Sequence, residues 1–190
     1  MTRPRTIVLL LAAIIVGAIA VGCVPTGERP ELVDEYLDDA ASGPPIECLP
    51  PGDLFAGFEV QAVSVRTADG GVNQCVLVAD TPELRQRGLS GVPDLGGHIG
   101  MIFAFPEDTT GSFWMGNTHV PLTIAFIDST GGVVAILDME PCPDAGADCP
   151  SYFPDTPYRW ALEVPVGQLT MFGLVDGAVF DTATLPVAAG

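Results

Sequence analysis

Apolar residues along this chain occur in short runs that are separated by turn-forming glycine, proline and aspartate residues. Beyond residue 57 the principal runs cover residues 58–65, 72–79, 101–105, 120–127, 133–139, 159–164 and 178–182. Many short apolar runs with little helical periodicity are typical of a β-sandwich or a β-barrel. We therefore predict one mainly β domain over residues 58–186, with antiparallel strands and one or two short helices.

Turn and cap residues place the first elements of this domain. The alternation that starts at Phe58 shifts by one position after Ala62, which predicts a bulge or a strand break there. The glycine-containing turn at 69–71 predicts a hairpin between the strands that flank it. Thr81, followed by proline and an acid, predicts the start of a helix, and Gly88 ends that helix.

The segment 113–128 is central to the predicted domain. Its first three residues are large and apolar, and we expect Trp114 to pack in the core. The next residues favour a sharp turn, in which Gly116 allows a positive φ and the amide of Asn117 braces the backbone. The continuous apolar run at 120–127 predicts a strand that is buried on both faces.

The N-terminal residues predict export and a lipid anchor. Arg3 and Arg5 precede an uncharged apolar run at 7–24, which is typical of a secretory signal over residues 1–22. The run ends Ala-Val-Gly-Cys, which resembles the lipobox of bacterial lipoprotein precursors, so we expect Cys23 to be acylated and to begin the mature protein. An uncleaved membrane anchor is the alternative, because the apolar run reaches the lower limit for spanning a bilayer.

A tether is predicted between this anchor and the β domain. Residues 23–57 are rich in proline, glycine and acid, as in segments that hold a domain away from a membrane. Within the tether, residues 30–41 place apolar side chains on one helical face, which predicts a short helix. We therefore expect an exported protein, held on the outer face of the cytoplasmic membrane or in a periplasm.

The charge balance restricts the partners of the protein. The formal net charge is −17, with 24 acidic residues against seven basic ones. Loss of residues 1–22 removes two arginines and no acid, so the mature chain is more acidic still. Because such a surface repels nucleic acid and anionic headgroups, we expect no nucleic-acid partner and membrane contact through the lipid anchor.

Four further cysteines predict disulfides, because an even number of cysteines in an exported protein usually pairs. Cys142 and Cys149 enclose a short flexible loop and are the expected first pair. Cys48 is then left to pair with Cys75. A zinc site is the alternative, but the sequence contains no C-x-x-C spacing.

A series of motifs runs from about Val60 to Phe180. The motifs are Gly88-Leu89, Gly100-Met101-Ile102-Phe103, Phe113-Trp114-Met115-Gly116-Asn117-Thr118, Pro121-Leu122, Phe126-Ile127-Asp128, Met139-Glu140-Pro141 and Leu162-Glu163-Val164. Their order and spacing resemble those of the uncharacterised bacterial and archaeal family called domain of unknown function 192. The resemblance implies a mostly antiparallel β domain of jelly-roll-like type, often exported or lipid-anchored, and it implies no established activity.

Glu163 is the main candidate for acid chemistry. On an alternating strand beside Trp160 and Leu162, it could be a buried acid with a raised pKa, as general acids require. Alternatively, Glu163 pairs with an arginine such as Arg159 or caps a backbone turn. Nucleophile-elbow, P-loop and dinucleotide motifs are absent from the sequence, so a carboxylate-based hydrolase acting on envelope or extracellular material ranks second.

A binding or structural module ranks first. Trp114, Asn117, Thr118 and His119 lie at the predicted turn, where binding residues concentrate, and with Glu163 they are the candidate ligand-binding residues. An aromatic ring beside an amide suits a small polar ligand, a glycan or a segment of an envelope protein.

Copper binding ranks third. The residues that suit copper in an exported protein are Met101, Met115, Met139, Met171, His98 and His119. No M-x-x-M or H-x-M cluster occurs, and methionines inside apolar runs usually fill gaps in a core. We therefore expect no metal and no cofactor.

Overall fold

The structure is a computed structural model that describes residues 46–144, 148–175 and 178–189. All of these residues fall within one compact unit. The predicted signal sequence, Cys23 and the predicted helix at 30–41 lie outside the described residues. Within the described ranges, no helix has the length and the apolar character needed to cross a membrane.

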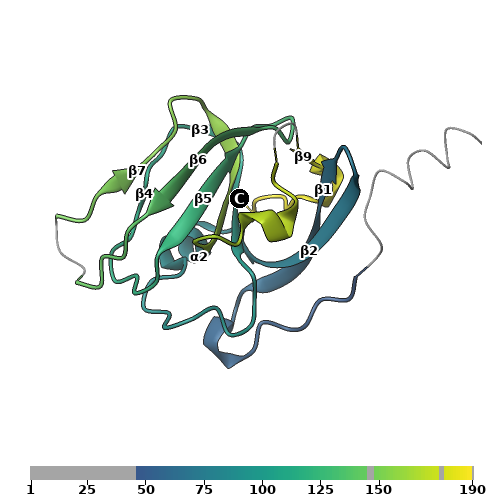
Figure 1. The fold of residues 1–190 in the computed structure, drawn as a ribbon. Helices are drawn as coiled ribbons and strands as arrows, with labels where there is room; N and C mark the ends of the chain where they lie inside the picture. Colours follow the sequence, from purple (N-terminus) through teal and green to yellow (C-terminus); the bar gives the residue numbers. More distant parts are fainter. Residues whose placement is uncertain (1–45, 145–147, 176–177, 190) are drawn as a thin grey trace, which may run out of the picture. The chain divides into compact units, whose positions relative to one another are not determined.

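Strands dominate the described part of the chain (Figure 1). The strands are β1 (Glu59–Thr67), β2 (Gly70–Ala79), β3 (Met101–Thr109), β4 (Phe113–Trp114), β5 (Leu122–Ile127), β6 (Val133–Met139), β7 (Ser151–Tyr152), β8 (Tyr158–Pro165) and β9 (Val179–Phe180). The helical elements are α2 (Pro82–Arg87) and the 3-10 turns η1 (Asp53–Phe55), η2 (Leu169–Phe172) and η3 (Thr182–Thr184). The predicted mainly β fold with few helical residues is confirmed.

Seven strands form the main sheet, in the order β6-β5-β8-β3-β2-β1-β9, and β4 pairs with β7 in a separate two-stranded sheet. Neighbouring strands of the main sheet run antiparallel except at one pair, β2 and β3, where Leu77 is the parallel partner of Met101. The predicted mostly antiparallel arrangement is therefore confirmed, with one parallel pair that the sequence did not indicate. The chain between β2 and β3 carries α2 and brings the start of β3 beside the last three residues of β2, in the same direction, and a parallel pairing requires such a crossover.

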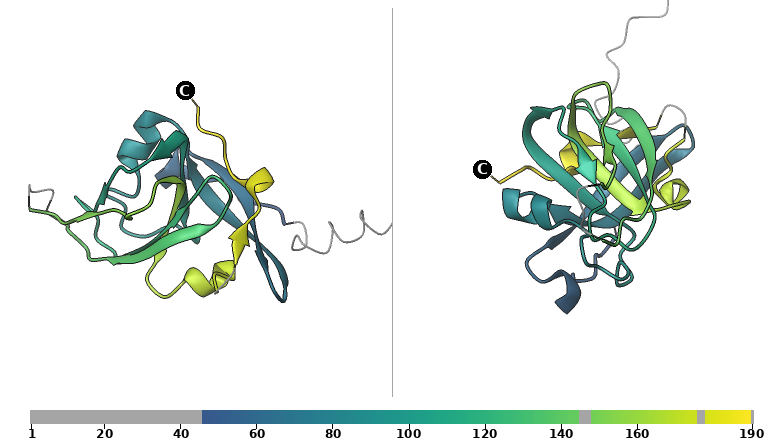
Figure 2. Two further views of the ribbon diagram at one scale, coloured as in Figure 1. Left: turned by 90° about the horizontal axis from the view of Figure 1, so that it is seen from above. Right: turned by 90° about the vertical axis from the view of Figure 1, so that its left-hand side faces the viewer.

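The main sheet has a hydrophobic core on each face. The first core contains Leu77, Met101, Phe103, Ile124 and Phe126, and Leu89, Val92 and Leu95 from the segment after α2 cover it. The second core contains Val63, Val76, Ile102, Leu162 and Phe180, together with Phe172 and Leu185. Helix α2 contacts β2 beside the sheet (Figure 2).

The two edge strands of the main sheet meet at a single bridge between Gly132 and Val179. The amide of Phe180 also donates to the carbonyl of Gly131 at 2.9 Å. Gly131 has a φ of 89°, and a Cβ at this position would collide with the Phe180 carbonyl, so the close approach requires glycine. The sheet is therefore barrel-like around its second core but not a closed barrel.

The predicted bulge near Ala62 is absent from β1, which pairs with β2 in an unbroken register from Glu59 to Thr67. The shift in the apolar pattern has a different cause. Val60 packs against the first core, whereas Val63 and Val65 are buried in the second core on the opposite face. The first part of β1 therefore packs against the first core and the second part against the second core, while the backbone of the strand stays regular.

The local signals for the hairpin and for the helix are confirmed. Strands β1 and β2 form the hairpin, with Thr67 paired to Gly70. The Thr81 side chain accepts a hydrogen bond from the amide of Leu84 at 3.2 Å, and Gly88 ends α2 with a φ of 46°. The strand predicted at 120–127 is β5, and all six of its residues are buried.

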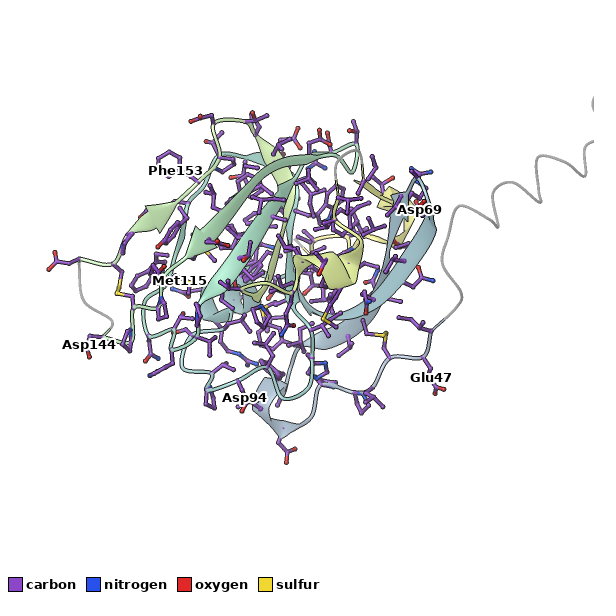
Figure 3. The ribbon with its side chains drawn as sticks, viewed as in Figure 1. Glu47, Asp69, Asp94, Met115, Asp144 and Phe153 are labelled. Atoms are coloured by element: carbon purple, nitrogen blue, oxygen red, sulfur yellow. A yellow bond between two sulfur atoms is a disulfide. The ribbon has the colours of Figure 1, made fainter. Side chains whose placement is uncertain are left out.

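Both predicted disulfides are present within the described residues. Cys48 is bonded to Cys75, with their Cα atoms 5.5 Å apart, and Cys142 is bonded to Cys149, with their Cα atoms 6.0 Å apart. Figure 3 shows the first disulfide near Glu47 and the second near Asp144. The first disulfide joins the end of the predicted tether to the sheet.

Candidate functional site

A single carboxyl interrupts an apolar row of side chains that crosses the main sheet. The strand register places Glu163 of β8 opposite Met101 of β3 on one side and Ile124 of β5 on the other. Beyond these two neighbours, the row continues to Leu77 of β2 and to Leu137 of β6. Because the four neighbours belong to or pack against the first core, Glu163 lies on that face of the sheet.

Glu163 is largely buried, and its carboxyl group has no protein partner. Among the described residues no fully buried side-chain oxygen or nitrogen lacks a partner, so the carboxyl oxygens of Glu163 are accessible from the cavity. The residue is 6% exposed, and its side chain makes no hydrogen bond or ion pair with any described residue. Burial raises the pKa of Glu163 from 4.5 to about 8, so the group is a neutral acid at pH 7. Arg159 pairs instead with Asp108 at 2.9 Å, so the interpretation of Glu163 as the partner of Arg159 is wrong.

Glu163 lines a cavity with a volume of about 320 Å³. Its walls include five aromatic residues: Phe103, Phe105, Phe113, Trp114 and Tyr158. The end of α2 and the loop that follows it complete the cavity. Among the described residues that line the cavity, Glu163 is the only acid.

The aromatic walls pack against one another in edge-to-face contacts. The ring of Phe113 lies 5.0 Å from that of Phe103, and the ring of Phe126 lies 4.8 Å from that of Tyr158. The Tyr158 hydroxyl donates to the carbonyl of Gly111 at 2.9 Å, and burial raises the pKa of Tyr158 to about 12. These contacts hold the aromatic part of the cavity wall in place.

Trp114 lies on the outer face of the two-stranded sheet and not in the core, so the expectation that it is a core residue is wrong. The residue is 57% exposed and pairs with Ser151 across the two strands. Its neighbour Phe113 faces the other way and packs against the first core. Alternation along the strand gives the two rings different surroundings, although both residues line the cavity: Phe113 from the core and Trp114 from the exposed side.

Asn117 supports the turn through its backbone and not through its amide. Its φ is 59°, the only positive value at a non-glycine residue in the described ranges, and Gly116 does not have a positive φ. The carbonyl of Asn117 accepts a hydrogen bond from the amide of Gly91 at 2.7 Å. The side-chain amide makes no hydrogen bond with a described residue, so the expected bracing by this group is wrong.

Thr118 is buried and lines the cavity, whereas His119 is exposed and does not line it. The backbone of Thr118 is tied on both sides: its amide donates to the carbonyl of Met115 at 2.9 Å, and its carbonyl accepts from the amide of Cys142 at 3.0 Å. The structure thus brings Trp114, Thr118 and Glu163 to one cavity and leaves Asn117 and His119 outside its lining.

Two arginines that the sequence did not single out also line the cavity. Arg85 and Arg87 are in the last turn of α2, where the Thr81 cap and Gly88 set the helix ends. The Nη1 atom of Arg85 donates to two backbone carbonyls at 2.6 and 2.7 Å, and its guanidinium lies 5.2 Å from the centre of the Phe105 ring. The scarcity of basic residues in so acidic a chain was the one signal that could have drawn attention to them.

The methionine and histidine residues that could bind copper do not form a cluster among the described residues. Met101, Met115 and Met139 are buried in the first core, and Met171 is 46% exposed. His98 lies edge-on to the ring of Phe55. Within the described ranges, no group of three or more histidine, cysteine or acidic residues could hold a metal ion.

One family model matches more than half of the chain. The model of the domain of unknown function 192 family (DUF192), described as an uncharacterized ACR, matches residues 64–182. No curated protein matches the chain.

Two solved structures are similar to this chain. A protein of unknown function from Novosphingobium aromaticivorans shares 25% sequence identity with a TM-score of 0.56, over 75% of this chain and 94% of that one. A protein from Sinorhizobium meliloti, described as a candidate transcription regulator, shares 27% identity with a TM-score of 0.55, over 67% of this chain and 97% of that one.

Proposed function

The chain belongs to the domain of unknown function 192 family, and we propose that it is an extracytoplasmic lipoprotein whose β domain binds a small ligand in the Glu163 cavity. The ligand has an apolar body, which the aromatic walls contact, and at least one hydrogen-bond acceptor, which receives the proton of Glu163. One observation carries the proposal. Glu163 is a buried acid without a partner, at a position where the fold needs only an apolar side chain.

The energetics of Glu163 support binding over a structural role. The carboxyl oxygens of Glu163 are accessible from the cavity, but the side chain is largely removed from water and has no protein partner. The full cost of a buried polar group without a hydrogen bond, roughly 1–3 kcal/mol, is therefore an upper limit here. An apolar residue at this place in the row between Met101 and Ile124 would avoid that loss. A ligand acceptor atom in the cavity would supply the missing hydrogen bond, so the stability lost in the free protein is recovered on binding.

The dimensions of the site favour a small ligand. A volume of about 320 Å³ lies at the lower end of the range for small-molecule sites, which is roughly 300–1,000 Å³. Trp114, exposed in the lining, offers a face on which a flat ring could stack. Thr118 adds a hydroxyl that makes no hydrogen bond with a described residue.

The proposed location rests on the sequence, and the disulfides support it. Two disulfides suit an oxidising compartment outside the cytoplasm. Intact mass of the membrane-extracted protein tests the anchor: we expect a chain that begins at an acylated Cys23. Retention of residues 1–22, or normal anchoring of Cys23→Ser, would contradict it.

We do not extend the description of the Sinorhizobium meliloti structure to this chain. DNA binding depends on basic residues that neutralise phosphates, whereas the net charge here is −17. The proposal therefore excludes nucleic acid as a partner. Titration with a mixed-sequence DNA duplex at low salt checks this, and micromolar binding would overturn it.

A fragment screen by ligand-observed NMR tests the binding proposal. We expect monocyclic fragments to bind wild type at neutral pH and to lose binding in Glu163→Leu. Glu47→Gln is the matched control, because Glu47 is exposed and does not line the cavity. Absence of all binding, or hits that Glu163→Leu retains, would contradict a ligand site at Glu163.

A hydrolase is the second candidate, because the raised pKa of Glu163 is also a property of general acids. Glycoside hydrolysis usually needs a second carboxyl group, and the described lining of the cavity contains none. We therefore rank binding above hydrolysis. Turnover of a glycan or ester substrate that is abolished by Glu163→Gln would reverse this ranking.

A further inference from the structure

We infer that the ligand of the Glu163 cavity is a small organic anion, a carboxylate carried on a single apolar ring. The inference rests on the proposed function and names its ligand class. Three features carry it: the distribution of charge over the described residues, the unused hydrogen-bond donors of Arg85, and the absence of any acid other than Glu163 among the described residues of the lining.

The cavity is a basic site on an acidic protein. The basic residues in the described ranges are Arg66, Arg85, Arg87 and Arg159. Two of these four line the cavity, although acidic residues outnumber basic ones more than threefold in the chain. Because Glu163 is neutral when protonated, the lining then carries only positive charge.

Neither cavity arginine has a carboxylate partner. The one ion pair among the described residues joins Arg159 to Asp108. Arg87 donates from both terminal nitrogens to the carbonyl of Ala56 at 3.0 Å. An arginine without a counterion beside an apolar wall has charge that an anionic ligand can neutralise.

Arg85 retains donors for such a ligand. A guanidinium carries five N–H donors, and the hydrogen bonds of Arg85 to Asp80 and Ala104 involve Nη1 alone. Its Nε and Nη2 atoms make no hydrogen bond with a described residue. The two carbonyls and the Phe105 ring hold the guanidinium in place, so little side-chain freedom would be lost on binding.

A cationic ligand is the main alternative, because aromatic walls beside a carboxyl also suit an ammonium group. The charges in the lining argue against it. An ammonium group would enter beside Arg85 and Arg87, and it would require Glu163 to lose its proton in a site where burial opposes ionisation. An anion is attracted by the two arginines and leaves Glu163 protonated.

Three probes of matched size separate the classes: benzoate, benzamide and benzylamine, which are negative, neutral and positive at neutral pH. Tryptophan fluorescence reports binding, because Trp114 lines the cavity and the only other tryptophan, Trp160, donates its indole N–H to Pro186. We expect benzoate to bind wild type roughly tenfold more tightly than the other two probes, which is the effect of one charge-assisted hydrogen bond.

Arginine variants test the source of the preference. Replacing both Arg85 and Arg87 with glutamine should weaken benzoate roughly tenfold and leave benzamide unchanged. Arg66→Gln is the matched control, because it removes the same charge from an exposed residue outside the cavity. The guanidinium of Arg87 is held by Ala56 and lies 4.1 Å from the centre of the Phe58 ring, so Arg85 supplies the free donors. Arg85→Lys, which keeps the charge and removes the Nε and Nη2 donors, serves if the double variant does not fold, and it should weaken benzoate severalfold.

Equal losses in Arg66→Gln, or tighter binding of benzamide or benzylamine, would overturn the anion class. The proposed function would still stand if the tighter probe needed Glu163. If other fragments occupy the cavity while benzoate does not bind, the anion class also fails. If no fragment binds at all, the binding function itself fails.

Discussion

The indole ring of Trp114 packs directly over the backbone of Gly116, in the space that a Cβ on residue 116 would need. Gly116 does not have a positive φ, so the requirement for glycine here is steric and not conformational. The contact fixes an exposed aromatic ring beside the cavity without help from the core. The position of the Trp114 ring, and with it this part of the cavity lining, therefore depends on Gly116.

Gly116→Ala should displace the ring of Trp114. We expect a change in tryptophan emission, a loss of stability of about 1 kcal/mol and weaker ligand binding. Gly111→Ala is the matched control, because a Cβ at Gly111 would make only ordinary contacts and this residue also has no positive φ. Identical emission spectra for the two variants would contradict the proposed contact.

Two variants of Asn117 show whether its backbone conformation or its side-chain amide stabilises the turn. Asn117→Ala should lower the free energy of unfolding by about 1 kcal/mol, because alanine tolerates a φ of 59° poorly. Asn117→Gly should remain within about 0.5 kcal/mol of wild type, because glycine accepts this conformation. Denaturant unfolding measures both. Equal losses in the two variants would show that the amide braces the turn after all.

The two disulfides should contribute unequally to stability. In the chain-entropy model, the Cys48–Cys75 bond, with a separation of 27 residues, contributes about 3.5 kcal/mol. The Cys142–Cys149 bond, with a separation of seven, contributes about 2.5 kcal/mol. Unfolding of the paired serine variants checks this order, and a larger loss at Cys142–Cys149 would contradict it.

Local signals made much of the fold predictable. The Thr81 cap, the Gly88 stop and the hairpin turn before β2 each depend on residues only a few positions apart. The disulfide partners followed from their number and from the short loop between Cys142 and Cys149. The parallel pairing of β2 with β3 was not predictable, because it depends on where the chain returns after α2.

The site was only partly predictable, for a related reason. A strand pattern shows that Trp114 and Phe113 face opposite ways, but it does not show which face the core covers. The unpartnered state of Glu163 depends on the register of β8 with β3 and β5. Arg85 is held at the cavity by hydrogen bonds to the carbonyls of Asp80 and Ala104, which no spacing in the sequence reveals.

Stability should depend on pH through Glu163. Burial raises its pKa from 4.5 to about 8, so below pH 4.5 the group is protonated in the folded and the unfolded chain alike. Between pH 4.5 and about pH 8 only the unfolded chain loses the proton, so the free energy of unfolding falls as pH rises. By neutral pH the loss is on the order of 3 kcal/mol.

Glu163→Gln should lack this decline, because glutamine does not ionise. The measurement is denaturant unfolding of wild type and variant across the same pH range. Asp128 does not interfere: burial alone would raise its pKa, but hydrogen bonds from Thr130, Gly131 and Gly132 lower it below 3.8, so its effect appears only in stronger acid. Parallel profiles for wild type and Glu163→Gln would contradict the raised pKa.

Glu163 is proposed to bind a ligand and not to stabilise the fold. The most direct test of this proposal is the free energy of unfolding of Glu163→Leu at neutral pH. Thr123→Val is the control, because Thr123 is a buried polar residue with a partner, donating to Asp138 at 2.6 Å.

We expect the free energy of unfolding of Glu163→Leu to be at least 1 kcal/mol higher than that of wild type. Leucine replaces a largely buried acid, which has no protein partner, in an apolar row of side chains. Thr123→Val should be less stable than wild type by about 1 kcal/mol. If Glu163→Leu is destabilised as Thr123→Val is, the acid has a structural role and the ligand site loses its main support.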